Sequence, residues 1–139
     1  MSGEQGNLRI ARAWINRTLN DHDLNAVNEF VHPDFRSASD PDIAGPGGER
    51  DGLSYLFSAF SDFSYEIDQL IAEGDRVAVY GTARGTHTGE FMGVQGTGKS
   101  FEAQSIEIMQ FKDGKCVYGF PVFDLKAACE QLGIPEADG

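Results

Sequence analysis

The chain has 139 residues, of which 40% are hydrophobic and 24% are charged, and its formal net charge is −11. This size and composition predict one globular domain over residues 1–139, with frayed ends at about 1–6 and 135–139. So acidic a surface disfavours nucleic acid and anionic membrane surfaces as partners, and no apolar stretch reaches the roughly 18 residues of a membrane span.

The first half of the chain predicts three helices. Apolar residues recur at helical spacing over 8–20, and a second, shorter helix carries residues 24–31 until Pro33 ends it. Residues 36–48 are polar and then rich in glycine and proline, which predicts a loop. A third helix follows, and its apolar face carries Leu53, Leu56, Phe57 and Phe60.

The second half of the chain predicts mostly antiparallel strands and one last helix. The Asp113-Gly114 pair is a strong hairpin signal between the last two strands. Helices first and strands afterwards indicate an α+β fold, with helices packed on one face of a curved sheet. The expected strands are 63–71, 76–87, 101–111 and 116–123, and the expected helix is 125–132.

Residues 93–100, Gly-Val-Gln-Gly-Thr-Gly-Lys-Ser, match the phosphate-loop pattern G-x-x-x-x-G-K-[ST]. That chemistry requires a loop that opens a helix, because the amides of the helix N-terminus hold the phosphates. Here Lys99 leads into residues 101–106, which have the pattern of a strand. We therefore interpret the motif as a connection between two strands and predict no nucleotide binding.

Several short sequence motifs, spread over nearly the whole chain, occur in an order and spacing that are together typical of one protein family. Residues 71–79 (IAEGDRVAV) and 85–93 (GTHTGEFMG) are the longest, and residues 31–35 and 45–48 match upstream loops. With these residues the chain resembles the SnoaL-like polyketide cyclases of the nuclear-transport-factor-2-like superfamily. The resemblance implies a cone-shaped, curved mixed or antiparallel sheet, N-terminal helices on its concave face, an enclosed pocket and a homodimer. Shorter matches are 97–99, 113–115, Asp124 and 131–133.

The resemblance also implies a reaction, which is ring closure by intramolecular aldol condensation without metal or cofactor. In the family pattern E-H-W-x-x-x-D, the aspartate takes a proton from an activated carbon. The aligned run here is YGFPVFD, residues 118–124. It keeps Asp124 as the implied general acid/base, places Phe120 in the tryptophan slot, and has Gly119 in the histidine slot.

Asp124 has two interpretations from the residues themselves. Alternation with period two puts Cys116, Tyr118, Phe120, Val122 and Asp124 on one face of the last strand, barring a bulge. At the rim of that apolar face the aspartate would be partly desolvated, which raises its pKa as a general base requires. Alternatively, Asp124 caps the helix that begins at residue 125, where aspartate is favoured.

The remaining site candidates each have a structural alternative. His87 is a candidate to polarise a substrate carbonyl, although we favour a histidine bonded to a turn backbone. Glu107 is a candidate second acid near Asp124 if it points inward, and we expect it to point outward. Tyr80, Tyr65 and Tyr118 are candidate hydroxyl donors or wall residues, Phe120 would hold substrate rings, and Trp14 packs the first helix on the sheet or lines the pocket mouth.

No metal or cofactor is expected. The three histidines and two cysteines show neither H-x-x-x-H nor C-x-x-C spacing. Cys116 and Cys129 are interpreted as small apolar fillers in a reducing compartment, and the N-terminus lacks the design of a signal peptide, so we expect a cytoplasmic protein.

Three functions stay open at this point. The first is a cofactor-independent cyclase, or a related lyase or isomerase, acting on an apolar, polyketide-like or polycyclic small molecule. An epoxide hydrolase is a variant that requires an Asp-Arg-Asp arrangement, for which Arg84 is the one arginine in the interior of an expected strand. The second is a non-catalytic binding protein for an apolar ligand, in which catalysis is lost with the imidazole missing at Gly119. The third is a dimerisation module.

Overall fold

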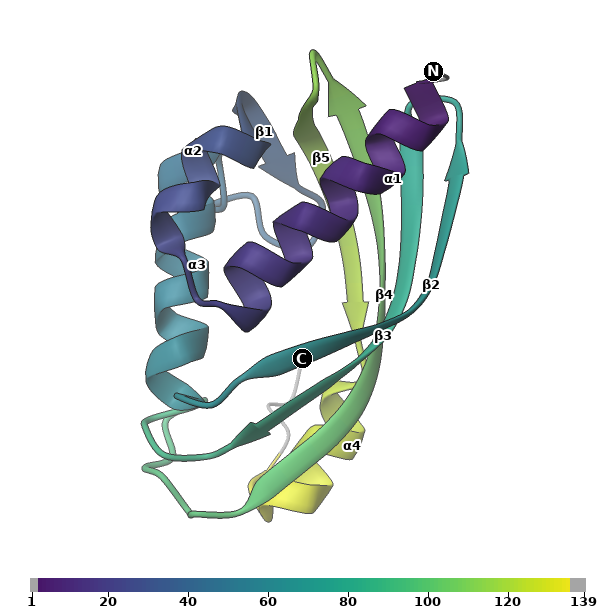
Figure 1. Ribbon diagram of the computed structural model, residues 1–139. Helices are drawn as coiled ribbons and strands as arrows, with labels where there is room; N and C mark the ends of the chain where they lie inside the picture. The colour runs from purple at the N-terminus through teal and green to yellow at the C-terminus, as the bar shows by residue number, and fades with distance from the viewer. Residues whose placement is uncertain (1–2, 136–139) are drawn as a thin grey trace.

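The computed structural model describes residues 3–135 and has a five-stranded sheet in the order β1-β5-β4-β3-β2 (Figure 1). The edge strand β1 runs parallel to β5, and every other neighbouring pair is antiparallel. The α+β fold with a curved, mixed sheet is therefore confirmed, as are all four strands expected from the sequence. The strands are β1 (Val31–Ser37), β2 (Ser64–Glu73), β3 (Arg76–Thr86), β4 (Ser100–Lys112) and β5 (Lys115–Phe123).

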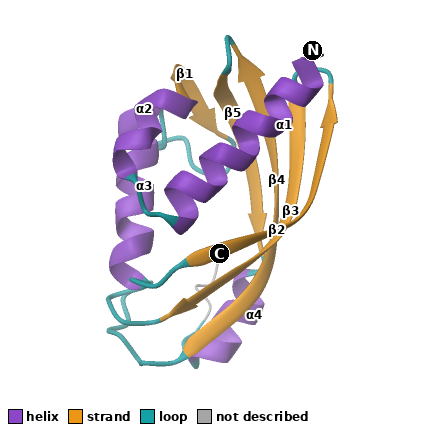
Figure 2. Cartoon of the chain, viewed as in Figure 1, coloured by secondary structure: helices purple, strands orange, loops and turns teal. Residues whose placement is uncertain are grey.

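The N-terminal helices cover the concave face of the sheet, and the last helix lies near one end of β4 (Figures 1 and 2). This places helices and strands on two sides of one apolar interior, which is the architecture that the family resemblance implied. The helices are α1 (Gly3–Trp14), the π-helix η1 (Ile15–Asn20), the 3-10 helix η2 (Leu24–Ala26), α2 (Val27–Phe30), α3 (Gly45–Ala59) and α4 (Leu125–Leu132).

The end of η1 is fixed to the start of β2 by one asparagine. Asn20 donates its side-chain amide to the carbonyl of Tyr65 at 3.0 Å, and its side-chain oxygen accepts the Tyr65 backbone N–H at 2.7 Å. Thr18, fully buried in the same turn, donates its hydroxyl to the Trp14 carbonyl. Since both backbone groups of Tyr65 are held, the ring of this residue has a defined place over the sheet.

Gly81 on β3 leaves the space that the Tyr65 ring occupies. A Cβ at position 81 would lie 2.3 Å from Cε1 of Tyr65 and 2.5 Å from the carbonyl oxygen of Glu66. The register of β2 on β3 shifts beside this glycine, between Ile67 and Gln69. A bulge of this kind bends the strand, and here it turns β2 toward the helices.

Three segments differ from the sequence-based expectation. Residues 31–37 form β1, although Pro33 predicted the end of a helix there; an edge strand tolerates proline because it needs no partner for that nitrogen. The helix α3 begins at Gly45, so residues 45–48 are helical and not loop, with Pro46 in the first turn where its missing N–H costs nothing. Residues 3–6, expected to fray, form the first turn of α1, whereas 1–2 and 136–139 lie outside the described residues.

Two other expectations concern the loop after β3 and membranes. Residues 88–98 connect β3 to β4, and β4 begins at Ser100, so the lysine of the phosphate-loop pattern leads into a strand and not a helix. A Cβ at Gly133 would lie 2.9 Å from Lys99 Nζ, so this ammonium lies at the C-terminus of α4, where a cation is favourable. Within residues 3–135, no helix is long and apolar enough to span a bilayer.

Candidate active site

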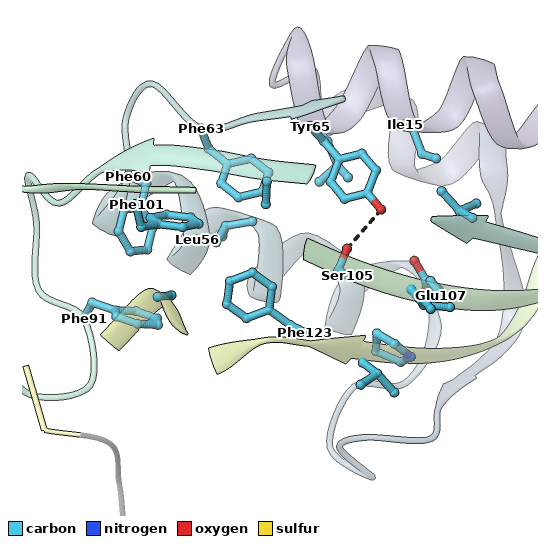
Figure 3. Close-up of a pocket in the computed structure, with 17 residues that line it drawn as sticks. Ile15, Leu56, Phe60, Phe63, Tyr65, Phe91, Phe101, Ser105, Glu107 and Phe123 are labelled. Atoms are coloured by element: carbon cyan, nitrogen blue, oxygen red, sulfur yellow. Dashed lines mark hydrogen bonds between the residues drawn. The ribbon is translucent and has the colours of Figure 1, made fainter. Parts of the chain in front are cut away.

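An apolar cavity of about 300 Å³ lies between the concave face of the sheet and the helices (Figure 3). Its lining comes from η1, α3, α4, the loop after β3 and four strands. None of the described residues that line it is lysine, arginine or histidine. The walls are largely aromatic, and the phenylalanines among them are Phe60, Phe63, Phe91, Phe101 and Phe123.

Three polar side chains line this cavity together: Tyr65, Ser105 and Glu107. Figure 3 shows them at one end of the cavity, away from the rings of Phe60, Phe91 and Phe101. Ser105 and Glu107 are two residues apart on β4, so both point to the concave face. The polar groups are therefore concentrated on one wall of an otherwise apolar space.

The hydroxyl of Tyr65 is oriented by Ser105. Ser105 Oγ donates to Tyr65 Oη at 2.9 Å, which leaves the phenolic hydrogen free to be donated to a bound molecule. Burial is the main cause that raises the pKa of Tyr65, and the nearby charges of Glu107 and Asp68 add to it. The phenol is therefore neutral near pH 7 and acts as a hydrogen-bond donor.

Glu107 is a carboxyl group held in an apolar interior. Burial, and secondarily the charge of Glu49, raises its pKa to about 8. The space it occupies is left by Gly119 on β5, because a Cβ at that position would lie 2.8 Å from Glu107 Oε2. Gly119 stands where the family pattern has a histidine. In this chain the carboxyl of Glu107 therefore occupies the space next to Gly119 into which a histidine side chain would extend.

Replacing Gly119 with alanine is expected to displace Glu107, since 2.8 Å is closer than a methyl group and an oxygen approach without strain. We expect ligand turnover to fall by at least tenfold, whereas the unfolding free energy should change by less than about 1 kcal/mol, because the atom displaced is the end of a flexible side chain. Steady-state kinetics and urea unfolding measure both effects. The control is Gly47→Ala in α3, where a Cβ meets nothing within 4 Å. Unchanged kinetics in the Gly119 variant would contradict the assigned position of Glu107.

A second, smaller cavity of about 60 Å³ lies behind Glu107. It is lined by a second acidic residue, Glu49 of α3, whose pKa is raised to about 7 by burial. Burial also raises the pKa of the Cys116 thiol, which lines the same space. The other residues around it are apolar: Trp14, Leu19, Val31, Phe35, Leu53 and Met109.

Asp124 is exposed and caps α4, where its side chain accepts the backbone N–H of Ala127 at 3.1 Å. It is not among the residues that line either cavity. Of the two interpretations drawn from the sequence, the helix cap matches this geometry.

Tyr118, Phe120 and Tyr80 lie on the outer face of the sheet and not in the cavity. The register of β4 on β5 shifts so that Phe111 pairs with Cys116 but Gln110 with Tyr118. This bulge breaks the expected alternation: Cys116 is buried, while Tyr118 is 39% and Phe120 48% exposed. Tyr80 pairs with Ile106, which is exposed on the same outer face. On β5 the side chains of Pro121 and Phe123 line the cavity instead.

His87 is fully buried and fixes the loop after β3, as we favoured. Its Nδ1 accepts the backbone N–H of Thr97 at 3.2 Å, so its Nε2 carries the hydrogen and donates to the Val94 carbonyl at 3.2 Å. Both ring nitrogens are therefore occupied within the protein. His87 does not line the cavity, and its geometry is that of a structural residue.

Two further candidates have definite places. Trp14 is buried, packs against Phe30 with ring centroids 5.8 Å apart, and lines the small cavity. Arg84 points outward and pairs with Glu66 at 2.8 Å and Glu102 at 2.7 Å, and no arginine is among the described residues that line the cavity, where an Asp-Arg-Asp epoxide hydrolase site would need one.

The outward orientation expected for Glu107 is wrong, and Glu49 was not singled out at all. Glu107 stands between Ile106 and Ile108, which suggested an inner face for the isoleucines, yet both are exposed on the outer face. Glu49 had a signal in the sequence, because it precedes Leu53 by four and Leu56 by seven residues on the apolar stripe of α3. A charged residue in phase with a buried stripe is a candidate for function.

Comparisons with known proteins identify the family and the fold of this chain. The family described as SnoaL-like polyketide cyclase matches residues 9–132. The aklanonic acid methyl ester cyclase DnrD of Streptomyces peucetius is 27% identical over 114 residues, covering 78% of this chain and 79% of DnrD. AcmA of Streptomyces galilaeus, with the same described activity, is 26% identical and covers 78% of each chain. The structure of TsrD from Streptomyces laurentii superposes with a TM-score of 0.86 over 94% of this chain and 97% of TsrD, at 24% identity, and shows the shared fold.

Proposed function

This chain belongs to the SnoaL-like polyketide cyclase family, and we propose that it closes a ring in an uncharged, polyketide-like molecule by an aldol-type addition within the molecule, without loss of water and without metal or cofactor. The observation that carries the proposal is a half-buried carboxyl, Glu107, facing an apolar cavity beside the Tyr65–Ser105 hydroxyl pair. A carboxyl with a pKa of about 8 is a stronger base than an ordinary glutamate and works near neutral pH.

The reaction follows from these groups. The Glu107 carboxylate takes a proton from a carbon next to a carbonyl, and the C–H electron pair forms an enolate. The Tyr65 hydroxyl donates a hydrogen bond to the enolate oxygen, where negative charge develops. The enolate carbon attacks a second carbonyl carbon of the same molecule, a C–C bond forms, and the resulting alkoxide takes the proton back from Glu107. Atoms balance, because the product is an isomer of the substrate.

The lining of the cavity selects the substrate class. Phenylalanine rings favour flat, ring-bearing molecules, and a volume of about 300 Å³ is within the range of small-molecule sites. No basic side chain among the described lining residues compensates a negative charge, and Glu107 repels one. An ester or another neutral form therefore fits better than a free carboxylate.

Aklanonic acid methyl ester, the compound named for two relatives, is a suitable first substrate. We expect the protein to convert it to an isomer of unchanged mass and altered retention in liquid chromatography–mass spectrometry, with equal rates with and without EDTA. Incorporation of solvent deuterium at the reacting carbon would report the proton abstraction. Ester that binds, as measured by equilibrium dialysis, but is not converted would favour the binding-protein alternative. Ester that does neither would contradict the proposed substrate class.

We also propose a homodimer in the cytoplasm. The outer face of the sheet carries exposed apolar residues in paired positions, Ile108 opposite Phe120 and Ile106 opposite Val122. Such a patch marks an association surface. Light scattering should give about twice the chain mass of 15.1 kDa, and Phe120→Glu should return it to one chain. Two buried, free thiols, Cys116 and Cys129, agree with a reducing compartment.

A further inference from the structure

Glu107 separates the two cavities and faces a second carboxyl across the smaller one. It lines the large cavity with Tyr65 and the small cavity with Glu49. The two acids come from different elements, β4 and α3, which pack on opposite sides of this space. The small cavity has room for a bridging water between them.

The surroundings of the pair contain no compensating charge. The titratable groups that face Glu107 are Glu49 from α3, Cys116 from β5 and Tyr65 from β2. The other elements contribute apolar side chains, among them Trp14 from α1 and Phe35 from β1. Among the described residues of both linings there is no lysine, arginine or histidine. Two carboxylates in such a space cannot both be ionised without strong repulsion.

We propose that Glu49 is a positioning residue that shares one proton with Glu107 and thereby sets the strength of Glu107 as the base of the proposed cyclisation. The inference rests on the proposed function of Glu107. When one proton is shared, the pair carries one negative charge, as in other sites built from adjacent carboxyls. Glu107 then takes the substrate proton and returns it to the alkoxide, while Glu49 supplies the charge that makes Glu107 hold that proton more firmly. Glu49 acts on Glu107 across the small cavity that both residues line, and it does not line the large cavity in which the substrate would bind.

The test is Glu49→Gln, with two readouts. In NMR titrations of ¹³C-labelled glutamate carboxyls in the free protein, we expect the midpoint of Glu107 to fall below its value of about 8 yet stay above 4.5, because burial, the larger cause, is unchanged. The acidic limb of the kcat/KM profile should move to lower pH by the same amount. Glu49→Asp, which keeps a charge, should restore the profile toward that of the unaltered protein.

The matched control is Asp51→Asn, an exposed acid on the same helix that removes the same formal charge. Its Glu107 midpoint should equal that of the unaltered protein. Equal Glu107 midpoints in the Glu49→Gln and unaltered proteins would overturn the inference.

A reciprocal titration covers the case in which Glu49→Gln does not fold. In Glu107→Gln, the Glu49 carboxyl should titrate in a single step, without the second inflection near pH 8 that its signal shows when a coupled Glu107 ionises. A Glu49 titration curve that is the same with and without the Glu107 carboxyl would equally overturn the inference. These titrations need no substrate, so they test the coupling of the two carboxyls separately from the proposed function. If the two carboxyls are coupled but the Glu107→Gln variant still closes the ring, the proposed function is contradicted and the coupling stands.

Discussion

Replacing Glu107 with glutamine is expected to lower kcat for ring closure by about 10²–10⁴-fold, the usual contribution of a positioned acid–base group. Glutamine has the size of glutamate and fits beside Gly119, but it neither takes nor returns a proton. Binding of the neutral ester should change by less than about threefold, because the aromatic walls are untouched. Single-turnover kinetics and equilibrium dialysis of the ester separate the two effects.

Asp124→Asn is the variant that discriminates the two candidate acids. Asparagine caps helices about as well as aspartate, so the turn at the start of α4 should be kept. Because Asp124 is exposed and outside the cavity, we expect turnover within about twofold of the unaltered protein. Loss of turnover in Asp124→Asn together with an active Glu107→Gln would make Asp124 the base and refute the assignment of Glu107.

The same Glu107→Gln substitution is expected to stabilise the protein at alkaline pH. The pKa of Glu107 is raised from 4.5 in the unfolded chain to about 8 in the fold, so the folded state prefers the protonated form. The protonated Glu107 makes its full contribution to the free energy of unfolding below about pH 4.5. This contribution decreases as the pH rises and is lost above about pH 8. At pH 8.5 the free energy of unfolding of Glu107→Gln should therefore exceed that of the unaltered protein by roughly 3 kcal/mol. This is less than the free energy that corresponds to the whole pKa shift, because the carboxyl borders cavities that admit water.

Urea unfolding at pH 5.5 and 8.5 measures this effect. The difference in unfolding free energy between the two pH values should shrink in Glu107→Gln, whereas Asp51→Asn should keep the slope of the unaltered protein. The control removes the same formal charge, so it accounts for the self-repulsion of a chain with net charge −11. A Glu107→Gln variant less stable than the unaltered protein at pH 8.5 would show that the carboxyl is not desolvated in the fold.

Loss of activity with gain of stability is the signature expected of a site that strains the fold for its chemistry. A hydrophobic or amide side chain at position 107 would suit the apolar interior better than a carboxyl. Two glycines contribute to this site. Gly119 lacks a side chain where Glu107 needs space, and Gly81 lacks one where the Tyr65 ring lies. The core around this site is organised to hold two polar groups in an apolar cavity.

The fold was largely predictable because its signals are local. Residues 76–87 and 101–111 alternate, and Asp113-Gly114 closes a hairpin, so the central strands follow from turn chemistry and period. The edge strand β1 was missed because residues 31–37 contain Pro33 and four polar residues. It forms through backbone pairing with β5, a contact far apart in sequence that its own residues do not announce.

The site was less predictable because one bulge decides which face is inner. The irregularity between Cys116 and Tyr118 sends Tyr118 and Phe120 to the outer face, while Pro121 and Phe123 line the cavity. On β4 the apolar residues also predicted the wrong inner face, because Ile106 and Ile108 are exposed whereas Glu107 lines the cavity. The alternation of a strand shows that neighbouring residues lie on opposite faces of the sheet. Which of the two faces is covered by the helices depends on the register of the whole sheet.

The most direct test of the account is the ionisation of Glu107 in the unaltered protein, measured by ¹³C NMR titration of its carboxyl with and without aklanonic acid methyl ester. We expect a midpoint close to 8 that moves when the ester binds, as a proton-transfer group in contact with the ligand requires. A midpoint near 4.5, unmoved by the ester, would mean a solvated carboxylate outside the binding cavity and would contradict the proposed role of Glu107.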